Sequence, residues 1–239
     1  MNYTNNENKE NKENKENNPN LNPTYFSFYI TYILLMTTAT ITFIEAMRTN
    51  IPEIRNILNL ETCVSIVAAF FYAKFVKMIE DKKINNKITY KEINDLRYLD
   101  WSITTPLLLL ELLLALSYNN KMGSVKFIYF IIILLLNYGM LGSGYLGEIN
   151  KVDKVSANII GFVFFIAIYL FIYIIYVRPK YNFDNYILYF SFVFLWSIYG
   201  IVYYFDEEAK NISYNILDLF AKCFLGIFFW AYFTKVFTI

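Results

Sequence analysis

Long apolar runs, separated by short polar connections, dominate the chain. A helix that crosses the hydrocarbon core of a bilayer needs roughly 20 predominantly apolar residues. A transmembrane β-barrel would instead show alternating segments of about ten residues. The pattern therefore predicts an all-α membrane protein, a bundle of seven transmembrane helices. The predicted helices are Tyr25–Met47, Leu58–Met78, Leu96–Tyr118, Val125–Gly147, Ala157–Val177, Tyr186–Phe205 and Ile212–Val236.

The first 22 residues have a different character from the rest of the chain. They repeat a Glu-Asn-Lys triplet and contain almost no apolar side chains. Such a segment cannot bury enough surface to offset the entropy of ordering, and it also lacks the apolar core of a signal peptide. We therefore expect a disordered polar tail over residues 1–22 and one membrane domain over residues 23–239.

Composition supports the membrane assignment and narrows the function. Of the 239 residues, 57% are hydrophobic and 17% are charged, against about 25% charged in ordinary soluble domains. The net charge of +1 provides no basic face for nucleic acid. The chain contains no histidine, which removes histidine-based zinc sites and Ser-His-Asp triads, so neither a metal site nor an enzyme is predicted. Cys63 and Cys223 lie in apolar runs and are interpreted as buried thiols.

The third run carries ionisable residues on one face. At about 100° per residue, Arg97, Asp100, Thr104, Leu108 and Glu111 fall within roughly 80° of each other on a helix. Asp100 and Glu111 lie about 16 Å apart along the axis, at a rise of about 1.5 Å per residue. This spacing suits a proton acceptor and a proton donor on opposite sides of a central group, but it equally suits two carboxyl groups that bond to neighbouring helices. Spacing alone leaves both interpretations open.

The seventh run contains Asp218 and Lys222 one helical turn apart. A lysine at this depth must lose its charge, form an ion pair or become a Schiff base. The apolar residues that follow Lys222 place it too deep to reach an interface easily by extending its side chain. Ionisable residues inside a membrane mark functional sites by default, so both residues are candidates.

Four segments resemble the microbial rhodopsins, and among them the proteorhodopsins. The third run reads RYLDWSITTPLLLLE from Arg97, and the seventh contains DLFAK from Asp218. The sixth run contains LWSIY from Leu195, and the fourth ends in GSGYLGE from Gly142. The resemblance covers all seven runs in order.

The resemblance implies that all-trans retinal lies in the centre of the bundle, bound to Lys222 as a protonated Schiff base. It implies homo-oligomers, trimers or pentamers, in a lipid bilayer with the N-terminus outside, an orientation that the lysines and arginines of the loops do not decide. The residues implied around the retinal, besides Lys222, are Trp101, Thr105, Leu108, Met140, Gly144, Trp196, Tyr199, Tyr203 and Ala221.

The resemblance also implies a light-driven outward proton pump. Asp100 is then the primary counterion and proton acceptor, and Asp218 is the second counterion. Arg97 lies on the extracellular side of both acids, and Glu111 is the cytoplasmic proton donor. Thr104 completes the acceptor–threonine–donor pattern of these pumps. Glu111 lies among leucines, so we expect it to be protonated at rest.

Several positions refine or qualify this interpretation. Leu108 stands where the family has leucine in green-absorbing and glutamine in blue-absorbing members, so we expect a green-absorbing pigment. Thr105 and Asn137 are expected to form a hydrogen bond between the third and fourth helices. Tyr72 lies near the place of the histidine that usually pairs with the acceptor, and Gly200 replaces a proline of the sixth helix.

Two other functions stay open. A light-gated channel needs a continuous hydrated path, and channel members of the family often carry several glutamates along the second helix. Here that run has Glu61 at its start and Glu80 at its exit, which favours a pump. A photosensor is less favoured because sensors commonly lose the donor acid that Glu111 provides.

Two features have no firm assignment. Lys74 lies within the second run and receives no role. Asp206, Glu207 and Glu208 form an acidic turn, which we interpret as solvated, with a proton-release cluster as the less favoured alternative.

Overall fold

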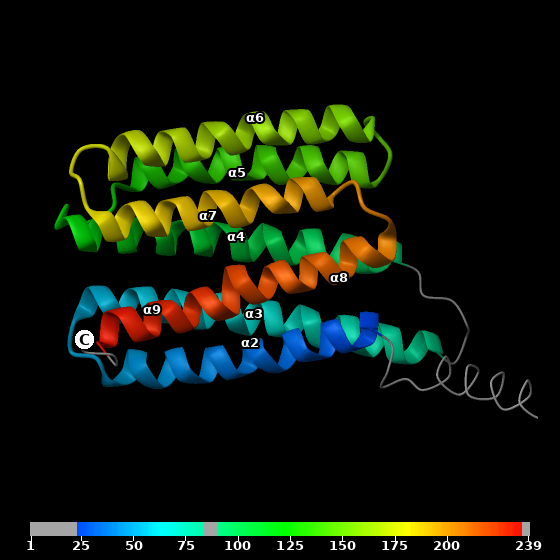
Figure 1. Cartoon of the computed structure of the whole chain (residues 1–239), viewed down its shortest axis with the longest axis horizontal. Coiled ribbons are helices and arrows are strands. Elements are labelled where there is room, and N and C mark those ends of the chain that lie inside the picture. Colours follow the sequence, from blue (N-terminus) through cyan, green and yellow to red (C-terminus); the bar gives the residue numbers. More distant parts are fainter. Residues whose placement is uncertain (1–22, 84–89, 236–239) are drawn as a thin grey trace, which may run out of the picture.

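Long helices that run side by side along one axis make up the fold (Figure 1). The computed structural model describes residues 23–83 and 90–235, so the predicted tail and Val236 lie outside the described residues. Seven helical stretches are long and apolar enough to cross a membrane, which confirms the predicted seven-helix bundle. The elements are α2 (Pro23–Arg48), α3 (Pro52–Lys83), α4 (Tyr90–Asn120), α5 (Phe127–Glu148), α6 (Lys154–Ile172), the π-helical turn η2 (Tyr173–Val177), α7 (Phe183–Val202), α8 (Glu207–Asp218), the π-helical turn η3 (Leu219–Phe224) and α9 (Leu225–Thr234).

Three helices begin five or six residues earlier than hydropathy predicts. The second begins at Pro52 instead of Leu58, the third at Tyr90 instead of Leu96, and the last at Glu207 instead of Ile212. Pro52 suits a first turn, where its missing N–H costs nothing. Before the last helix, the Asp206 carboxylate accepts a hydrogen bond from the Ala209 amide at 3.0 Å, which caps the helix. Hydropathy marks the part of a helix that lies in the membrane, whereas caps mark where the helix itself begins.

The last span lies in the middle of the bundle. In Figure 1, α8 and α9 lie between the α2–α3 pair and the α4–α7 pair, and they contact α2, α3 and α7. The bundle has two ends, which we name by the chain. The N-terminal end holds the start of α2, the end of α5 and the start of α8, and the C-terminal end holds the last residues of α9. The central position of α8, η3 and α9 allows their side chains to meet residues of α3, α4 and α7.

Apolar side chains cover the outside of the bundle, while polar side chains gather within it. Phe43, Val163 and Phe194 are more than half exposed, whereas Glu61 and Asp100 are fully buried. This is the reverse of the usual arrangement in a protein surrounded by water, and lipid accounts for it. Charged groups in such an interior mark a functional centre.

Three expectations about single residues are resolved by the fold. Cys223 is buried as expected, but Cys63 is exposed on α3, so its interpretation as a buried thiol is wrong. Gly200 lies within the unbroken α7, and a Cβ atom there would approach the Phe162 ring to 2.5 Å, so glycine permits close packing of α6 on α7. Lys74 is exposed on α3, and its ammonium lies 4.5 Å from the centre of the Phe70 ring.

Candidate functional site

Lys222 lies in a widened turn in the middle of the last span. The turn η3, from Leu219 to Phe224, interrupts the α-helix directly after Asp218, the last residue of α8. Single π-helical turns inside α-helices occur frequently at functional sites. The Lys222 side chain is 1% exposed. The structure therefore places this lysine in the interior, away from either membrane surface.

Two carboxylates contact the buried ammonium of Lys222. Its Nζ atom donates hydrogen bonds to Oδ2 of Asp100 at 2.9 Å and to Oδ2 of Asp218 at 3.2 Å. Nη1 of Arg97 lies 3.8 Å from the same oxygen of Asp218. All four side chains are almost completely buried. Two cations thus balance two anions, as burial of charge requires.

The two carboxylates differ in how fully they are satisfied. Asp218 accepts hydrogen bonds from the hydroxyl groups of Tyr199, at 2.6 Å, and Tyr72, at 2.8 Å. Among the described residues, Oδ1 of Asp100 has no hydrogen-bond partner. Thr104 donates to the backbone carbonyl of Asp100 at 2.9 Å and not to its carboxyl group. An ionised carboxylate offers about four lone-pair sites. From the described residues, the Asp100 carboxylate accepts one hydrogen bond and the Asp218 carboxylate accepts three, so Asp100 is the less fully hydrogen-bonded of the two.

Arg97 connects this centre to the N-terminal end of the bundle. Its guanidinium donates to Tyr72 Oη at 3.2 Å, to Asn215 Oδ1 at 2.8 Å and to Asn211 Oδ1 at 3.1 Å. Arg97 therefore joins the ion pairs around Lys222 to polar groups of α8 nearer the membrane surface. Tyr72, which stands near the place of the expected histidine, serves here as a hydrogen-bond donor to Asp218.

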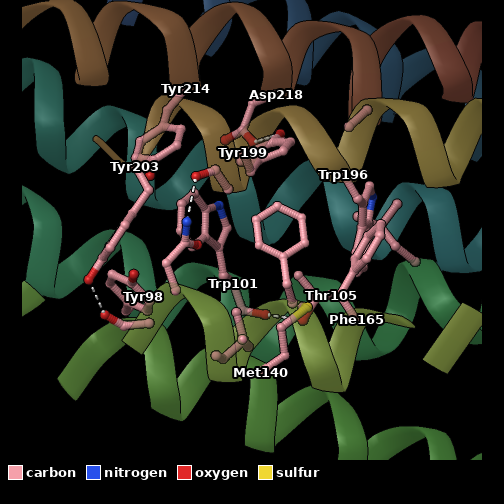
Figure 2. A pocket seen from close by; sticks show the side chains of 18 of the residues that line it. Tyr98, Trp101, Thr105, Met140, Phe165, Trp196, Tyr199, Tyr203, Tyr214 and Asp218 are labelled. Carbon is pink, nitrogen blue, oxygen red and sulfur yellow. Dashed lines mark hydrogen bonds between the residues drawn. The ribbon is translucent and has the colours of Figure 1, made fainter. Parts of the chain in front are cut away.

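A mainly apolar pocket with a cavity volume of about 120 Å³ adjoins Lys222. In Figure 2, Asp218 and Tyr199 lie on one wall and Met140 on the opposite wall, with Trp101 and Trp196 between them. All the residues that the sequence assigned to retinal binding line this pocket, namely Lys222, Trp101, Thr105, Leu108, Met140, Gly144, Trp196, Tyr199, Tyr203 and Ala221.

The pocket residues fit retinal in three respects. The walls of the pocket are aromatic and apolar, as a polyene requires. The Trp101 ring, for example, lies edge-on to the Tyr199 ring at a centroid distance of 5.5 Å. Lys222, which lines the pocket, provides a primary amine, the nucleophile that forms an imine with an aldehyde. Asp100 and Asp218 provide negative charge beside that amine. The predicted bond between α4 and α5 is confirmed, since Asn137 donates to Thr105 Oγ1 at 2.9 Å.

A second pair of acids lies closer to the C-terminal end. Glu111 of α4 and Glu61 of α3 are both fully buried and lie near each other. Neither carboxyl oxygen of Glu111 has a hydrogen-bond partner among the described residues. Glu61 also accepts a hydrogen bond from Ser65 at 2.8 Å. A Cβ atom at Gly226 would come within 2.5 Å of the Glu61 carboxyl group, so glycine at this position makes room for the acid.

Sequence analysis missed part of this arrangement. It treated Glu61 only as a residue near the start of a helix, although a carboxyl group in an apolar run was a sufficient signal. It also missed Asn211 and Asn215, which continue the polar face of Asp218 and Lys222 at helical spacing. No feature of the sequence shows that Glu61 and Glu111, on separate helices, meet.

Comparison with known proteins gives a consistent result. The family model described as bacteriorhodopsin-like protein matches residues 22–236. A green-light absorbing proteorhodopsin from Gamma-proteobacterium EBAC31A08 is 29% identical over 160 residues, which is 56% of this chain and 59% of that protein. The match therefore spans less than two thirds of this relative.

Solved structures are similar over nearly the whole chain. The viral rhodopsin OLPVRII is 48% identical, with a TM-score of 0.85 over 91% of this chain and 100% of that chain. The blue light-absorbing proteorhodopsin from Med12 is 25% identical, with a TM-score of 0.69 over 90% of this chain and 98% of that chain. Together with the family match, these similarities show that the chain belongs to the bacteriorhodopsin-like family, the microbial rhodopsins, whose members bind retinal.

Proposed function

We propose that this protein is a light-driven outward proton pump that carries all-trans retinal on Lys222. The observation that carries the proposal is the buried amine of Lys222, which contacts Asp100 and Asp218 beside an apolar pocket. When bound there, retinal supplies a light-absorbing polyene and a protonated Schiff-base linkage whose hold on its proton changes after isomerisation. The protein residues determine where that proton goes.

Asp100 is the group that accepts the proton from the Lys222 nitrogen. Its Oδ2 atom already accepts a hydrogen bond from that nitrogen, and its Oδ1 atom has no partner among the described residues. Asp218 keeps its negative charge, because Tyr72 and Tyr199 donate to both of its oxygens. Hydrogen bonds to an ionised carboxylate favour that form. This division of roles leaves one acceptor and one permanent counterion.

Glu111 returns a proton to the Lys222 nitrogen from the opposite side. It lies 11 residues after Asp100 in α4, which corresponds to about 16 Å along the helix. Its fully buried position favours the neutral acid, as a donor requires. Protons then move from the C-terminal end toward the N-terminal end of the bundle. With the N-terminus outside, this direction is outward.

Illumination of cells or liposomes tests the proposal directly. We expect protons to move toward the N-terminal side of the protein under light, and the movement to continue against an opposing potential of 100 mV. Such a potential costs about 2.3 kcal/mol per charge, which an energy-driven pump can supply. A current that reverses its direction with the voltage would identify a channel instead, and a complete lack of light-driven current would overturn both functions.

A light-gated channel is the second candidate because of Glu61. The residue is fully buried next to Glu111 instead of lying at a helix end. It therefore adds an acid to the bundle interior on α3, the helix along which channel members of the family carry glutamates. The voltage test above separates the two functions.

Replacing Glu111 by glutamine should slow proton return. We expect the dark spectrum to recover at least about 100-fold more slowly in Glu111→Gln, within the range for loss of a positioned general acid. The proton must then come from water, so recovery should slow about tenfold for each unit of pH increase. Flash spectroscopy at several pH values measures both effects.

Glu111→Asp and Glu61→Gln complete this experiment. Glu111→Asp keeps a carboxyl group and should recover much faster than Glu111→Gln. If Glu61→Gln shows the slow, pH-dependent recovery while Glu111→Gln recovers normally, the donor is Glu61 and our assignment is wrong.

We also propose that the protein forms a homo-oligomer, a trimer or a pentamer, and that α3 contributes to the interface. Asn59 and Lys74 are exposed on this helix, within a span that is otherwise apolar enough for the membrane. Polar side chains that face lipid are costly. Contact with a second copy would remove them from lipid.

A further inference from the structure

A buried lysine joins three helices at the N-terminal end, in a place that the proposed proton path does not yet use. Nζ of Lys210 in α8 donates to Glu148 at the end of α5 and to Glu207 of α8, both at 2.7 Å. Asn94 of α4 donates to the same two acids, at 2.6 Å and 2.8 Å. The Lys210 side chain is 1% exposed. Glu207 is thus an ion-pair partner of Lys210, while its side chain stays 47% exposed, as expected for an acidic turn that reaches water.

This cluster is connected to the centre of the protein. Arg97, which lies beside Asp218, donates to Asn211 at 3.1 Å. Asn211 in turn donates to Asn94 Oδ1 at 3.3 Å and to the Glu207 carbonyl at 2.9 Å. A continuous set of hydrogen bonds therefore leads from the ion pairs of Lys222 to Glu148 and Glu207, two acids at the N-terminal end of the bundle.

The chemistry of this cluster depends on the ammonium group. The Glu148 side chain is 11% exposed and the Glu207 side chain 47%. Two carboxylates held this close tend to share one proton unless a positive charge provides compensation, because each disfavours ionisation of the other. Lys210 supplies the compensation, since its positive charge lies between them. Every hydrogen bond that the acids receive from Lys210 and Asn94 goes to a carboxylate oxygen as acceptor, and such charge-assisted bonds favour the ionised form.

We propose that Lys210 is a positioning residue that keeps Glu148 and Glu207 both ionised, so that the exit end of the proton path stores no proton. This inference rests on the proposed pump. The proton that Asp100 accepts is then the one that appears outside, and it appears only after Asp100 gives it up. Without Lys210, the two acids would hold one proton between them. When Asp100 became neutral, it would no longer offset the positive charge of Arg97. That charge would then favour the ionised form of both acids, and the stored proton would be released to water early.

The first test is made in the dark with the full, retinal-bound protein. Infrared spectra at neutral pH should show about one additional protonated carboxyl group in Lys210→Met, as expected for two acids that share a proton. The added signal should be absent from the wild type and from Lys210→Met/Glu207→Gln, which has only one acid left. Lys210→Arg and Lys151→Met, which changes an exposed lysine near the same end, should resemble the wild type. A Lys210→Met spectrum identical to that of the wild type would overturn the inference.

The second test measures when the proton leaves. A pH-sensitive dye in the outer medium is compared with the colour change that reports loss of the proton from the Lys222 nitrogen. In the wild type the dye should respond after that colour change, and in Lys210→Met it should respond together with it. Early release in the wild type would contradict the inference. If no variant moves protons in the light, the pump proposal fails, while the dark spectra still decide whether Lys210 keeps both acids ionised.

Discussion

Lys222→Ala should leave the protein without visible colour after retinal is added, and it should abolish all light-driven currents. The reason is covalent: among the residues that line the pocket, Lys222 provides the one primary amine, and alanine cannot form an imine with retinal. A visible spectrum of the purified protein measures the result. The wild type should absorb green light, as expected from Leu108, which is buried in the pocket wall.

The same substitution should also lower stability. Removal of one partner from a buried ion pair typically costs about 3–5 kcal/mol, because the remaining charge has no compensation. Here two acids, Asp100 and Asp218, lose the ammonium that both contact. We therefore expect Lys222→Ala to unfold at lower temperature than the wild type, with the loss reduced at low pH, where protonation removes the unpaired charge.

Two controls separate attachment from folding. Lys74→Ala removes an exposed lysine from α3 and should keep the colour. A preformed imine of retinal with a short alkylamine should fill the Lys222→Ala pocket and restore absorption, provided that the pocket is intact. Colour formation by Lys222→Ala with retinal alone would show that the chromophore is attached elsewhere.

The seven helices could be predicted from sequence because the bilayer sets their length. Each must present roughly 20 apolar residues, and the observed spans agree with the apolar runs to within about six residues. The central residues of the site could be predicted for a related reason. Charge is so costly in a membrane that Asp100 and Lys222 could hardly be incidental, and the structure brings them within 2.9 Å.

The contacts between side chains of different helices could not be predicted, because hydropathy does not show how helices are rotated against each other. Glu61 and Glu111 are 50 residues apart in the chain, and nothing local indicates that they meet. Lys210 lies outside the predicted apolar run, where a lysine normally extends to water. It is buried because its ammonium group bonds to Glu148 of α5, which also accepts a hydrogen bond from Asn94 of α4. Such contacts between helices depend on the packing of the whole bundle.

The π-helical turn η3 could not be predicted from the sequence either. A regular α-helix through Asp218 and Lys222 fits the sequence equally well, since both residues would share one face. The wider turn changes the direction of the side chains that follow it, and no residue type in Leu219–Phe224 marks such a turn. Its place at the functional lysine agrees with the general occurrence of π-helical turns at functional sites.

Asp100→Asn should produce a coloured protein that does not transport protons. The asparagine side chain keeps the shape of the acid but cannot accept the proton from the Lys222 nitrogen, so we expect light-driven acidification to fall at least 100-fold, in line with loss of a positioned proton acceptor. The absorption maximum should move to longer wavelength. A negative charge next to the Lys222 nitrogen stabilises the positive charge at that end of the chromophore in the ground state, and its removal narrows the energy gap.

The comparison with Asp218→Asn makes this prediction specific to Asp100. Asp218 also contacts Lys222, but its oxygens accept hydrogen bonds from Tyr72 and Tyr199, whereas Oδ1 of Asp100 has no partner in the described part of the chain. Asp218→Asn should therefore also shift the colour while the Lys222 nitrogen can still lose its proton, detected as a transient blue-shifted absorption. That transient should be absent from Asp100→Asn. Asp81→Asn, at an exposed position of α3, controls for the loss of an acid and should pump normally. If the transient vanishes in Asp218→Asn and persists in Asp100→Asn, the roles of the two acids are exchanged, and the unpartnered oxygen of Asp100 does not mark the acceptor.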